Sequence, residues 1–418
     1  MELYYSFSVL IVLSAIFSYI NERFLKLPST IGIMVIALLV SLGLILTDKI
    51  FPHTFQEFST FISSVDFTEV LMGAMLNFLL FAGAIHIRLS DLKEQKAPVM
   101  IFSTVSVIIS TFAVGFMLFY ILQWLNMGIP LIQCLLFGAL ISPTDPIAVL
   151  GILKQAGVPK SLETKVAGES LFNDGIAVVV FIIMLKLAQG EEVDLSFSSI
   201  SALLAKEALG GVALGLSLGY IASKTIGKID NYKLEVLITL AVVMGGHLVA
   251  SAMHMSGPLA MVAAGLVVGN YGRQFSLSEV SKDYLDKFWE LIDEILNAIL
   301  FLIIGFELII ITNIGDYWLI GIICIAMVLF ARLISIWLPV KIIPMKTKFN
   351  KATITILVWG GLRGGVSVAL ALSIDNHLNK DLLLSITYYV VLFSILVQGL
   401  TIGKLTNKAK KIVSAEAP

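Results

Sequence analysis

Three carboxyl groups stand inside apolar stretches of the chain and are the first candidates for chemistry. Asp145 lies in GALISPTDPIAVL (138–150), and Glu169 and Asp174 lie in GESLFNDGIAVVV (168–180). A charged side chain at bilayer depth costs roughly 2.5–3.5 kcal/mol on insertion scales, so such groups are usually functional. Their presence in two neighbouring apolar segments predicts a pathway for an ion.

Asp174 is the carboxyl group expected to carry the ion. Ser170 precedes it by four residues and therefore shares its helix face. A hydroxyl and a carboxylate offer the hard oxygen ligands that hard cations prefer, and Thr144 could add a hydroxyl and a free carbonyl. Such a site can hold either a proton or a cation, and this competition is sufficient for exchange if only a loaded site crosses the membrane. The alternative is a carboxylate that is hydrogen-bonded for structural reasons.

Two of the apolar stretches contain breaks in the helix. The segment Ser142–Pro146 has two prolines around Thr144 and Asp145, and proline removes a backbone donor and clashes with the preceding turn. Asp145 is expected to cap a new half-helix that begins at Pro146. The segment 360–365, GGLRGG, predicts a second break. Paired interrupted spans in the two halves of a membrane protein indicate a transport site.

The charged groups near these breaks suggest electrostatic partners. Where broken helices cross, an acid can offset the positive N-terminal ends and a cation the negative C-terminal ends, which suits Asp145 and Arg363. The alternative for Asp145 is that it carries a proton itself. Glu169 is expected to form a buried ion pair with Arg332, with a direct role in transport as the other possibility. Asn173 is predicted to bind the backbone freed at the first break and to belong to the cation and proton site.

Composition identifies a polytopic membrane protein. The chain has 418 residues, of which 58% are hydrophobic and only 14% charged, whereas soluble domains have about 25% charged residues. A net charge of −1 gives no indication of a nucleic-acid partner. The 2 cysteines and 5 histidines form no disulfide framework or metal motif, and no phosphate-binding loop is present, so no organic cofactor is expected.

About 20 apolar residues span a bilayer, and thirteen runs qualify or nearly qualify. They lie approximately at 3–20, 29–47, 67–87, 98–122, 131–153, 162–188, 204–223, 233–250, 257–270, 288–312, 316–340, 351–374 and 382–403. Most of the 28 Lys and Arg residues fall in alternate loops, after odd-numbered runs. The positive-inside rule then places the N-terminus outside and the C-terminus in the cytoplasm. A multi-pass protein of the plasma (inner) membrane is expected, bound by membrane lipid.

An acidic group begins the tenth run, at Glu290, Asp293 and Glu294. It is either a solvated helix start or a funnel that concentrates cations. Glu307, near the other end of this run, is expected to face a cavity or an interface.

The chain resembles the monovalent cation/proton antiporters, in the branch of bacterial NhaP-type exchangers and animal sodium/hydrogen exchangers. The matching segments are SPTDP (142–146), GESLFNDG (168–175), ARLIS around Arg332, WGGLRGGVSVALAL (359–372) and FWELIDEILNAILFLIIG (288–305). The order of TDP, then ESxxND, then GGLRGG is specific, and the similarity extends over essentially the whole chain.

The resemblance implies an all-α protein with 13 transmembrane helices, inverted repeats, two crossed discontinuous helices and elevator-like alternating access as a homodimer. It implies core repeats at 97–190 and 315–406, dimerisation-side and linking helices at 1–96 and 191–314, and a short basic tail at 407–418.

The resemblance also implies roles for individual residues. Asp174, aided by Ser170 and Thr144, would bind the transported Na⁺ or the proton. Asn173 before Asp174 is similar to the electroneutral members, which exchange one cation for one proton. One departure is Ala82, where several relatives carry a glutamate; water or Asn77 could replace that ligand.

Together these features predict an electroneutral Na⁺(Li⁺)/H⁺ antiporter rather than an enzyme. K⁺/H⁺ exchange is the alternative within transport. A cation channel or a membrane sensor is the alternative of another class.

Overall fold

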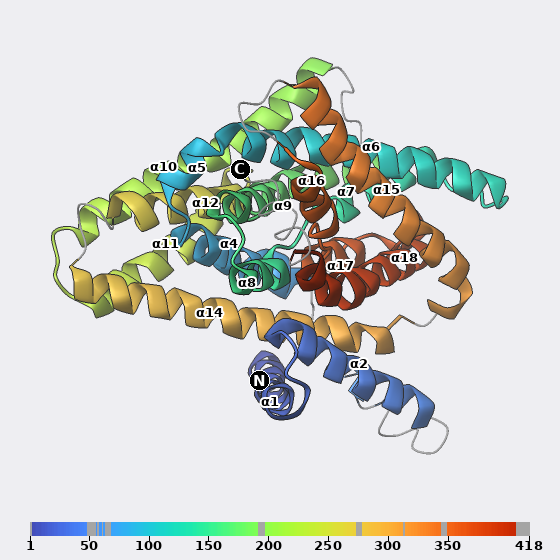
Figure 1. The fold of residues 1–418 in the computed structure, drawn as a ribbon, viewed down its shortest axis with the longest axis horizontal. Helices are drawn as coiled ribbons and strands as arrows, with labels where there is room; N and C mark the ends of the chain where they lie inside the picture. The colour runs from blue at the N-terminus through green and yellow to red at the C-terminus, as the bar shows by residue number, and fades with distance from the viewer. Residues whose placement is uncertain are drawn as a thin grey trace, which may run out of the picture.

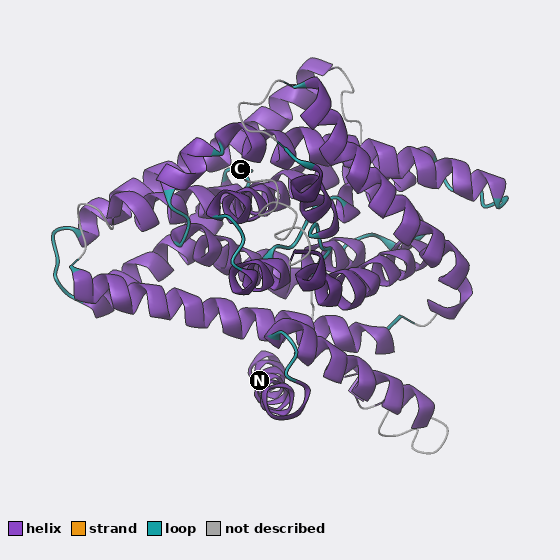
Figure 2. Cartoon of the chain, in the orientation of Figure 1, coloured by secondary structure: helices purple, strands orange, loops and turns teal. Residues whose placement is uncertain are grey.

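The computed structural model describes residues 2–47, 56, 58–60, 62, 68–190, 197–272, 278–311, 314–343 and 349–406. These residues are nearly all helical and include no β-strand (Figure 2). A helix satisfies its own backbone donors and acceptors, which the interior of a bilayer requires. The expected all-α membrane fold is therefore confirmed for the described part of the chain.

Eight helices among the described residues are long and apolar enough to cross a membrane. They are α1 (Glu2–Ile20, continued by η1, Asn21–Leu25), α2 (Ser29–Thr47), α6 (Lys96–Trp124), α9 (Lys160–Ala188), α10 (Phe197–Ile226), α11 (Tyr232–Ala252), α15 (Trp318–Ile342) and α18 (Lys380–Phe393, continued by η7, Ser394–Gln398).

The other five predicted spans coincide with helices that are shorter, interrupted or more charged. They are η2 with α4 (Glu69–Met75, Leu76–Ile85), α7 with α8 (Leu131–Ile141, Ile147–Ala156), α12 with η3 (Gly257–Val267, Val268–Gly272), α14 (Glu279–Phe306) and α16 with α17 (Lys351–Trp359, Gly365–Leu372). Every predicted span thus matches a helical element, and the number of thirteen crossings stays a prediction.

Short elements connect these helices. They are α5 (Leu89–Glu94) and the 3₁₀ turns η4 (Glu307–Ile309), η5 (Ile314–Tyr317) and η6 (Asn376–Leu378). The predicted basic tail, 407–418, lies outside the described residues.

The long helix α14 separates two parts of the bundle. In Figure 1 it runs along the lower edge of the main body, with α1 and α2 beyond it. On its other side α6 packs against α7, α9 and α15, and α12 packs against α4 and α10. The interrupted helices α7–α8 and α16–α17 lie in the middle of this main body (Figure 1), where other helices shield their unwound backbone from lipid.

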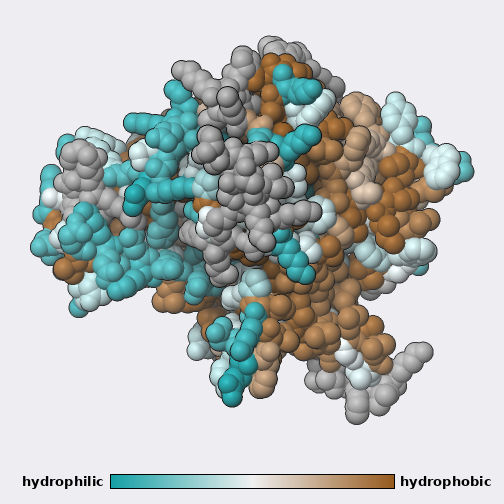
Figure 3. All heavy atoms as spheres, viewed as in Figure 1, coloured by the Kyte–Doolittle hydropathy of each residue, from teal (hydrophilic) through white to brown (hydrophobic). Residues whose placement is uncertain are grey.

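Hydrophilic and apolar residues occupy different parts of the visible surface (Figure 3). In Figure 3 hydrophilic residues gather over the left of the visible face, where α14 begins, and apolar residues cover most of the right and lower right. Large apolar side chains such as Trp124 and Leu248 are strongly exposed. Outward-facing apolar residues of this kind suit a protein surrounded by lipid rather than by water.

Candidate functional site

The two interrupted helices cross at their breaks. The helix α7 ends at Ile141 and α8 begins at Ile147, while α16 ends at Trp359 and α17 begins at Gly365. Between these ends the two segments are not helical and meet in an isolated antiparallel bridge, in which the Asp145 N–H donates a hydrogen bond of 2.8 Å to the Leu362 carbonyl. The predicted crossing of two discontinuous helices is what the structure shows.

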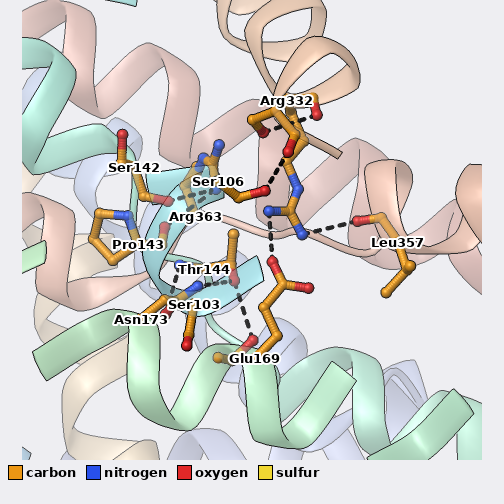
Figure 4. A network of polar contacts seen from close by, with 12 residues as sticks. Ser103, Ser106, Ser142, Pro143, Thr144, Glu169, Asn173, Arg332, Leu357 and Arg363 are labelled. Atoms are coloured by element: carbon orange, nitrogen blue, oxygen red, sulfur yellow. Dashed lines mark hydrogen bonds and ion pairs between the residues drawn. The ribbon is translucent and has the colours of Figure 1, made fainter. Parts of the chain in front are cut away.

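Arg363 lies against the C-terminal end of α7. Its Nη1 donates to the carbonyls of Ser142 and Pro143, each at 3.2 Å (Figure 4). The arginine is 2% exposed. Carbonyls at a helix C-terminus carry partial negative charge, so the buried guanidinium compensates for the end of α7 and satisfies carbonyls that the break has left open.

Asp145 lies between the N-terminal ends of two half-helices. It precedes α8 by two residues, and its side chain contacts the backbone of Gly364, the N-cap residue of α17. A Cβ atom at position 364 would overlap the Asp145 carboxyl group. Only glycine therefore lets the acid approach the positive end of α17.

Glu169 and Arg332 form a buried ion pair. The Arg332 Nη1 lies 2.6 Å from the Glu169 Oε1, and the side chains are 6% and 2% exposed respectively. The Arg332 Nη2 also donates to the Leu357 carbonyl at 3.0 Å, in the last turn of α16 (Figure 4). The pair thus ties α9 and α15 to the second broken helix.

Asp174 and Ser170 face a cavity of about 930 Å³. Both residues come from α9, and Asp174 is 8% exposed. The Ser170 hydroxyl lies 3.1 Å from the Thr144 hydroxyl of the first break. The described residues therefore place a carboxyl and a hydroxyl together where a small cation could be bound.

Thr144 and Asn173 lie behind this pair and do not line the cavity. The Asn173 Nδ2 donates to the Thr144 Oγ1 at 2.7 Å, and the Thr144 N–H donates to the Asn173 Oδ1 at 3.5 Å (Figure 4). Asn173 thus binds backbone freed at the break, as expected. In this conformation the polar groups of Thr144 and Asn173 bind each other and Ser170, and a role of the two residues as ligands stays a prediction.

The cavity has an acidic wall on α14. Asp286, Glu290, Asp293 and Glu294 line it, so the acidic cluster borders the cavity rather than bulk solvent alone. Lys160 also lines the cavity, and its Nζ lies 3.0 Å from the Asp91 Oδ2. This hydrogen bond holds the pKa of Asp91 below its usual value of 3.8. The route to Asp174 is therefore bordered mainly by negative charge.

Glu307 lies at the far end of α14. It is 2% exposed, and it does not line this cavity. The acid at that end is thus separate from the residues around Asp174.

Ala82, the position at which several relatives are expected to carry a glutamate, lines the cavity. The suggested substitute Asn77 does not line it. The Asn77 Nδ2 lies 3.1 Å from the His247 Nδ1 instead. In this conformation Asn77 therefore does not supply the ligand that a glutamate at position 82 would provide.

Two polar residues that support the second break were missed in the sequence. The Arg363 N–H donates to the Ser394 Oγ at 2.8 Å, and Ser394 in turn donates to the Gln398 Oε1 at 2.7 Å. The Gln398 Nε2 donates to the Trp359 carbonyl at 2.9 Å. Their four-residue spacing within an apolar run was the available signal.

Comparisons with known proteins agree over the length of the chain. Residues 11–408 match the family model described as "Sodium/hydrogen exchanger, transmembrane". The chain is 48% identical to the Na⁺/H⁺ antiporter NhaP of Pseudomonas aeruginosa over 408 residues, which cover 95% of each protein. It is 34% identical to the Na⁺/H⁺ antiporter NhaH of Halobacillus dabanensis, over 92% of this chain and 93% of the relative.

The fold resembles that of a solved structure. The sodium proton antiporter MjNhaP1 from Methanocaldococcus jannaschii at pH 8 superposes with a TM-score of 0.74 and 21% sequence identity. The match covers 98% of this chain and 99% of the other. At this identity the likeness supports the fold alone.

Proposed function

The chain belongs to the sodium/hydrogen exchanger family, and from this premise we propose that it exchanges Na⁺ or Li⁺ for H⁺ across a membrane. Its relatives in Pseudomonas and Halobacillus are named Na⁺/H⁺ antiporters and match it over more than nine-tenths of their length. These names favour Na⁺ over K⁺ as the cation.

One observation carries the proposal. Asp174 and Ser170 lie side by side on α9 in a cavity, directly beside the crossing of two broken helices. Half-helix ends and unwound backbone near the middle of a bundle are the features that transporters use to hold ions. A buried carboxyl group next to a hydroxyl can bind a proton or a small hard cation, and one excludes the other.

The stoichiometry of the proposal follows from the charges around Asp174. Glu169 is occupied by Arg332, and Asp145 lies against the start of α17. Asp174 is then the one acid at the crossing whose charge changes during turnover. A single exchangeable acid gives one cation for one proton, so the exchange is electroneutral and driven by either gradient.

Access to the site alternates between the two sides of the membrane. The cavity is also lined by His86, Arg88 and Lys160, which lie at or between helix ends expected on the cytoplasmic side. The conformation described here is then open to the cytoplasm, with the N-terminus outside. The proposal includes a homodimer in the plasma (inner) membrane and a moving core formed by 97–190 and 315–406.

The test is exchange in proteoliposomes. Addition of Na⁺ or Li⁺ should dissipate an imposed pH gradient, without any need for a compensating ion current. Asp174→Asn should abolish the response, since the amide can neither bind the proton nor neutralise the cation. The control is Asp283→Asn, which removes a charge from the exposed start of α14, where Asp283 binds Lys287. Cation movement without counter-movement of protons would show a channel instead.

A further inference from the structure

Asp293 and Asn297 form a polar pair on the cavity side of α14. They are four residues apart on this helix and therefore share a face, and both line the cavity that contains Asp174. Asp293 is half-buried, whereas Asn297 is 2% exposed. The pair is thus less exposed than Glu290 and Glu294 of the acidic wall.

The side-chain oxygen of Asn297 has no hydrogen-bond partner. Its amide hydrogen-bonds to the Asp293 carboxylate, while its Oδ1 is buried and accepts no hydrogen bond. Buried polar atoms in native proteins nearly always have a partner, so an exception requires an explanation such as a missing ion. A buried oxygen that accepts no hydrogen bond and lies next to a carboxylate could be satisfied by a bound cation.

A second buried oxygen without a hydrogen-bond partner lies in the same cavity. The Ser367 Oγ on α17 is buried without a partner, and Ser367 also lines the cavity. The helices α14 and α17 meet where the Leu300 side chain contacts the Gly365 backbone, one turn after Asn297 and two residues before Ser367. Two helices in contact therefore contribute unpartnered oxygens to one space.

The pair also lies on the route to Asp174. Asp145 is within electrostatic range of both the Asp174 and the Asp293 carboxyl groups. Along α14 the exposed Glu290 precedes Asp293, and Asn297 precedes Leu300, which contacts Gly365 at the start of α17. A cation that enters past Glu290 therefore meets Asp293 before the crossing. Successive acids lower the energy of the ion along such a path.

We propose that Asp293 and Asn297, with Ser367, form a second and weaker cation site that loads Asp174. Carboxylate, amide and hydroxyl oxygens are suitable ligands for a hard alkali cation. This site rests on the proposed exchange of Na⁺ for H⁺. It supplies ions to Asp174 without replacing it as the group that carries them across.

The first test is the Na⁺ dependence of exchange in proteoliposomes. Asp293→Asn should raise the KM for Na⁺ about tenfold, the lower end of what focusing of a charged substrate achieves, with kcat changed less than about twofold. Glu294→Gln removes a charge from the same turn at an exposed position, where solvent and salt screen it, and should raise KM less than about twofold. Ser367→Ala is a small change that should raise KM about threefold, since it removes one of several neutral ligands.

Equal effects of Asp293→Asn and Glu294→Gln would show general electrostatic attraction and would overturn the site. An unchanged KM in Asp293→Asn would also overturn it. A fall in kcat at constant KM would assign Asp293 to conformational change rather than to loading and would contradict the proposal.

The second test measures binding without transport. Asp174→Asn protein in detergent should retain weak binding of ²²Na⁺, and Asp174→Asn/Asp293→Asn protein should lose it. Binding that is absent from the first variant, or unchanged in the second, would refute a second site. This binding measurement does not depend on exchange. Wild-type vesicles that show no exchange would refute the proposed function, and the binding result would still decide whether the second site exists.

Discussion

Removal of one member of the Glu169–Arg332 pair should destabilise the protein far more than removal of both. The pair is almost completely buried, with 2.6 Å between the Arg332 Nη1 and the Glu169 Oε1. Breaking a buried pair by deleting one partner typically costs about 3–5 kcal/mol, because an uncompensated charge stays behind. Replacing both partners by well-packed hydrophobic side chains of similar volume is often neutral or stabilising, because no buried charge stays behind.

The structure predicts an order among the three variants. Glu169→Gln leaves the Arg332 guanidinium buried, but its hydrogen bond to the Leu357 carbonyl can persist. Arg332→Met leaves Glu169 charged and also removes that hydrogen bond, which adds about 1–3 kcal/mol for an unsatisfied carbonyl. Glu169→Gln/Arg332→Met leaves no buried charge, and its cost comes from the lost hydrogen bond, the packing and the buried amide of the new glutamine. We expect Arg332→Met to be the least stable variant and the double variant the most stable of the three.

The assay is thermal unfolding of the purified protein in detergent, followed by tryptophan fluorescence. For a chain of 418 residues each kcal/mol corresponds to about 1–2 °C by extrapolation from smaller domains. Glu169→Gln should therefore unfold about 3–10 °C below wild type, and Arg332→Met should unfold at a still lower temperature. The matched control is Lys165→Met, on α9 like Glu169. It removes a buried cation that lies 4.9 Å from the centre of the Phe349 ring. Its loss should cost about 0.5–2 kcal/mol.

Additive effects in this double-mutant cycle would refute the reasoning. If Glu169→Gln and Arg332→Met each lowered the Tm and the double variant lowered it by their sum, the two side chains would not be coupled. Single variants with wild-type Tm would contradict the buried pair altogether.

Two further outcomes follow from the geometry. Gly364→Ala should move the Asp145 carboxyl group away from the start of α17, because the new Cβ would overlap it. The rate of exchange in proteoliposomes should therefore fall roughly tenfold or more. The control is Gly128→Ala, which lies in open space on a loop and should keep the wild-type rate. Asp91 is bound to Lys160 and its pKa lies below 3.8, so this contact is present above that pH and is lost only as the pH falls through the lowered pKa. Asp91→Asn should therefore leave the shape of the exchange profile unchanged between about pH 6 and pH 9, and a shifted profile would show that Asp91 takes part in proton-linked steps.

The fold was predictable because bilayer spans leave strong local signals. Pro143 and Pro146 fix the first break, and the glycines at 360, 361, 364 and 365 fix the second, without reference to any tertiary contact. The tenth apolar run was predicted to begin near residue 288, and α14, which contains it, begins earlier, at Glu279, since its first turns are charged and carry no apolar run. Its N-cap Ser278, which accepts a hydrogen bond from the Ser281 N–H, was the missed signal.

The site was less predictable because its contacts are long-range. Spacing on one helix placed Ser170 and Asp174 together, whereas the turn of Asn77 toward His247 depends on how α4 and α11 pack. The support of Arg363 by Ser394 likewise joins two spans. Such pairings are decided by helix packing, which no local pattern encodes.

In the proposed exchange a single carboxyl group, that of Asp174, binds either a proton or Na⁺. The direct measurement is calorimetric titration of the purified protein with Na⁺ in two buffers of different ionisation enthalpy, at a pH where the empty site is protonated. Linkage predicts close to one proton released for each Na⁺ that occupies the Asp174 site. Asp293→Asn should keep this release, and Asp174→Asn/Asp293→Asn should show none. Binding of Na⁺ to Asp293→Asn without proton release, or proton release that persists in Asp174→Asn/Asp293→Asn, would contradict exchange at Asp174.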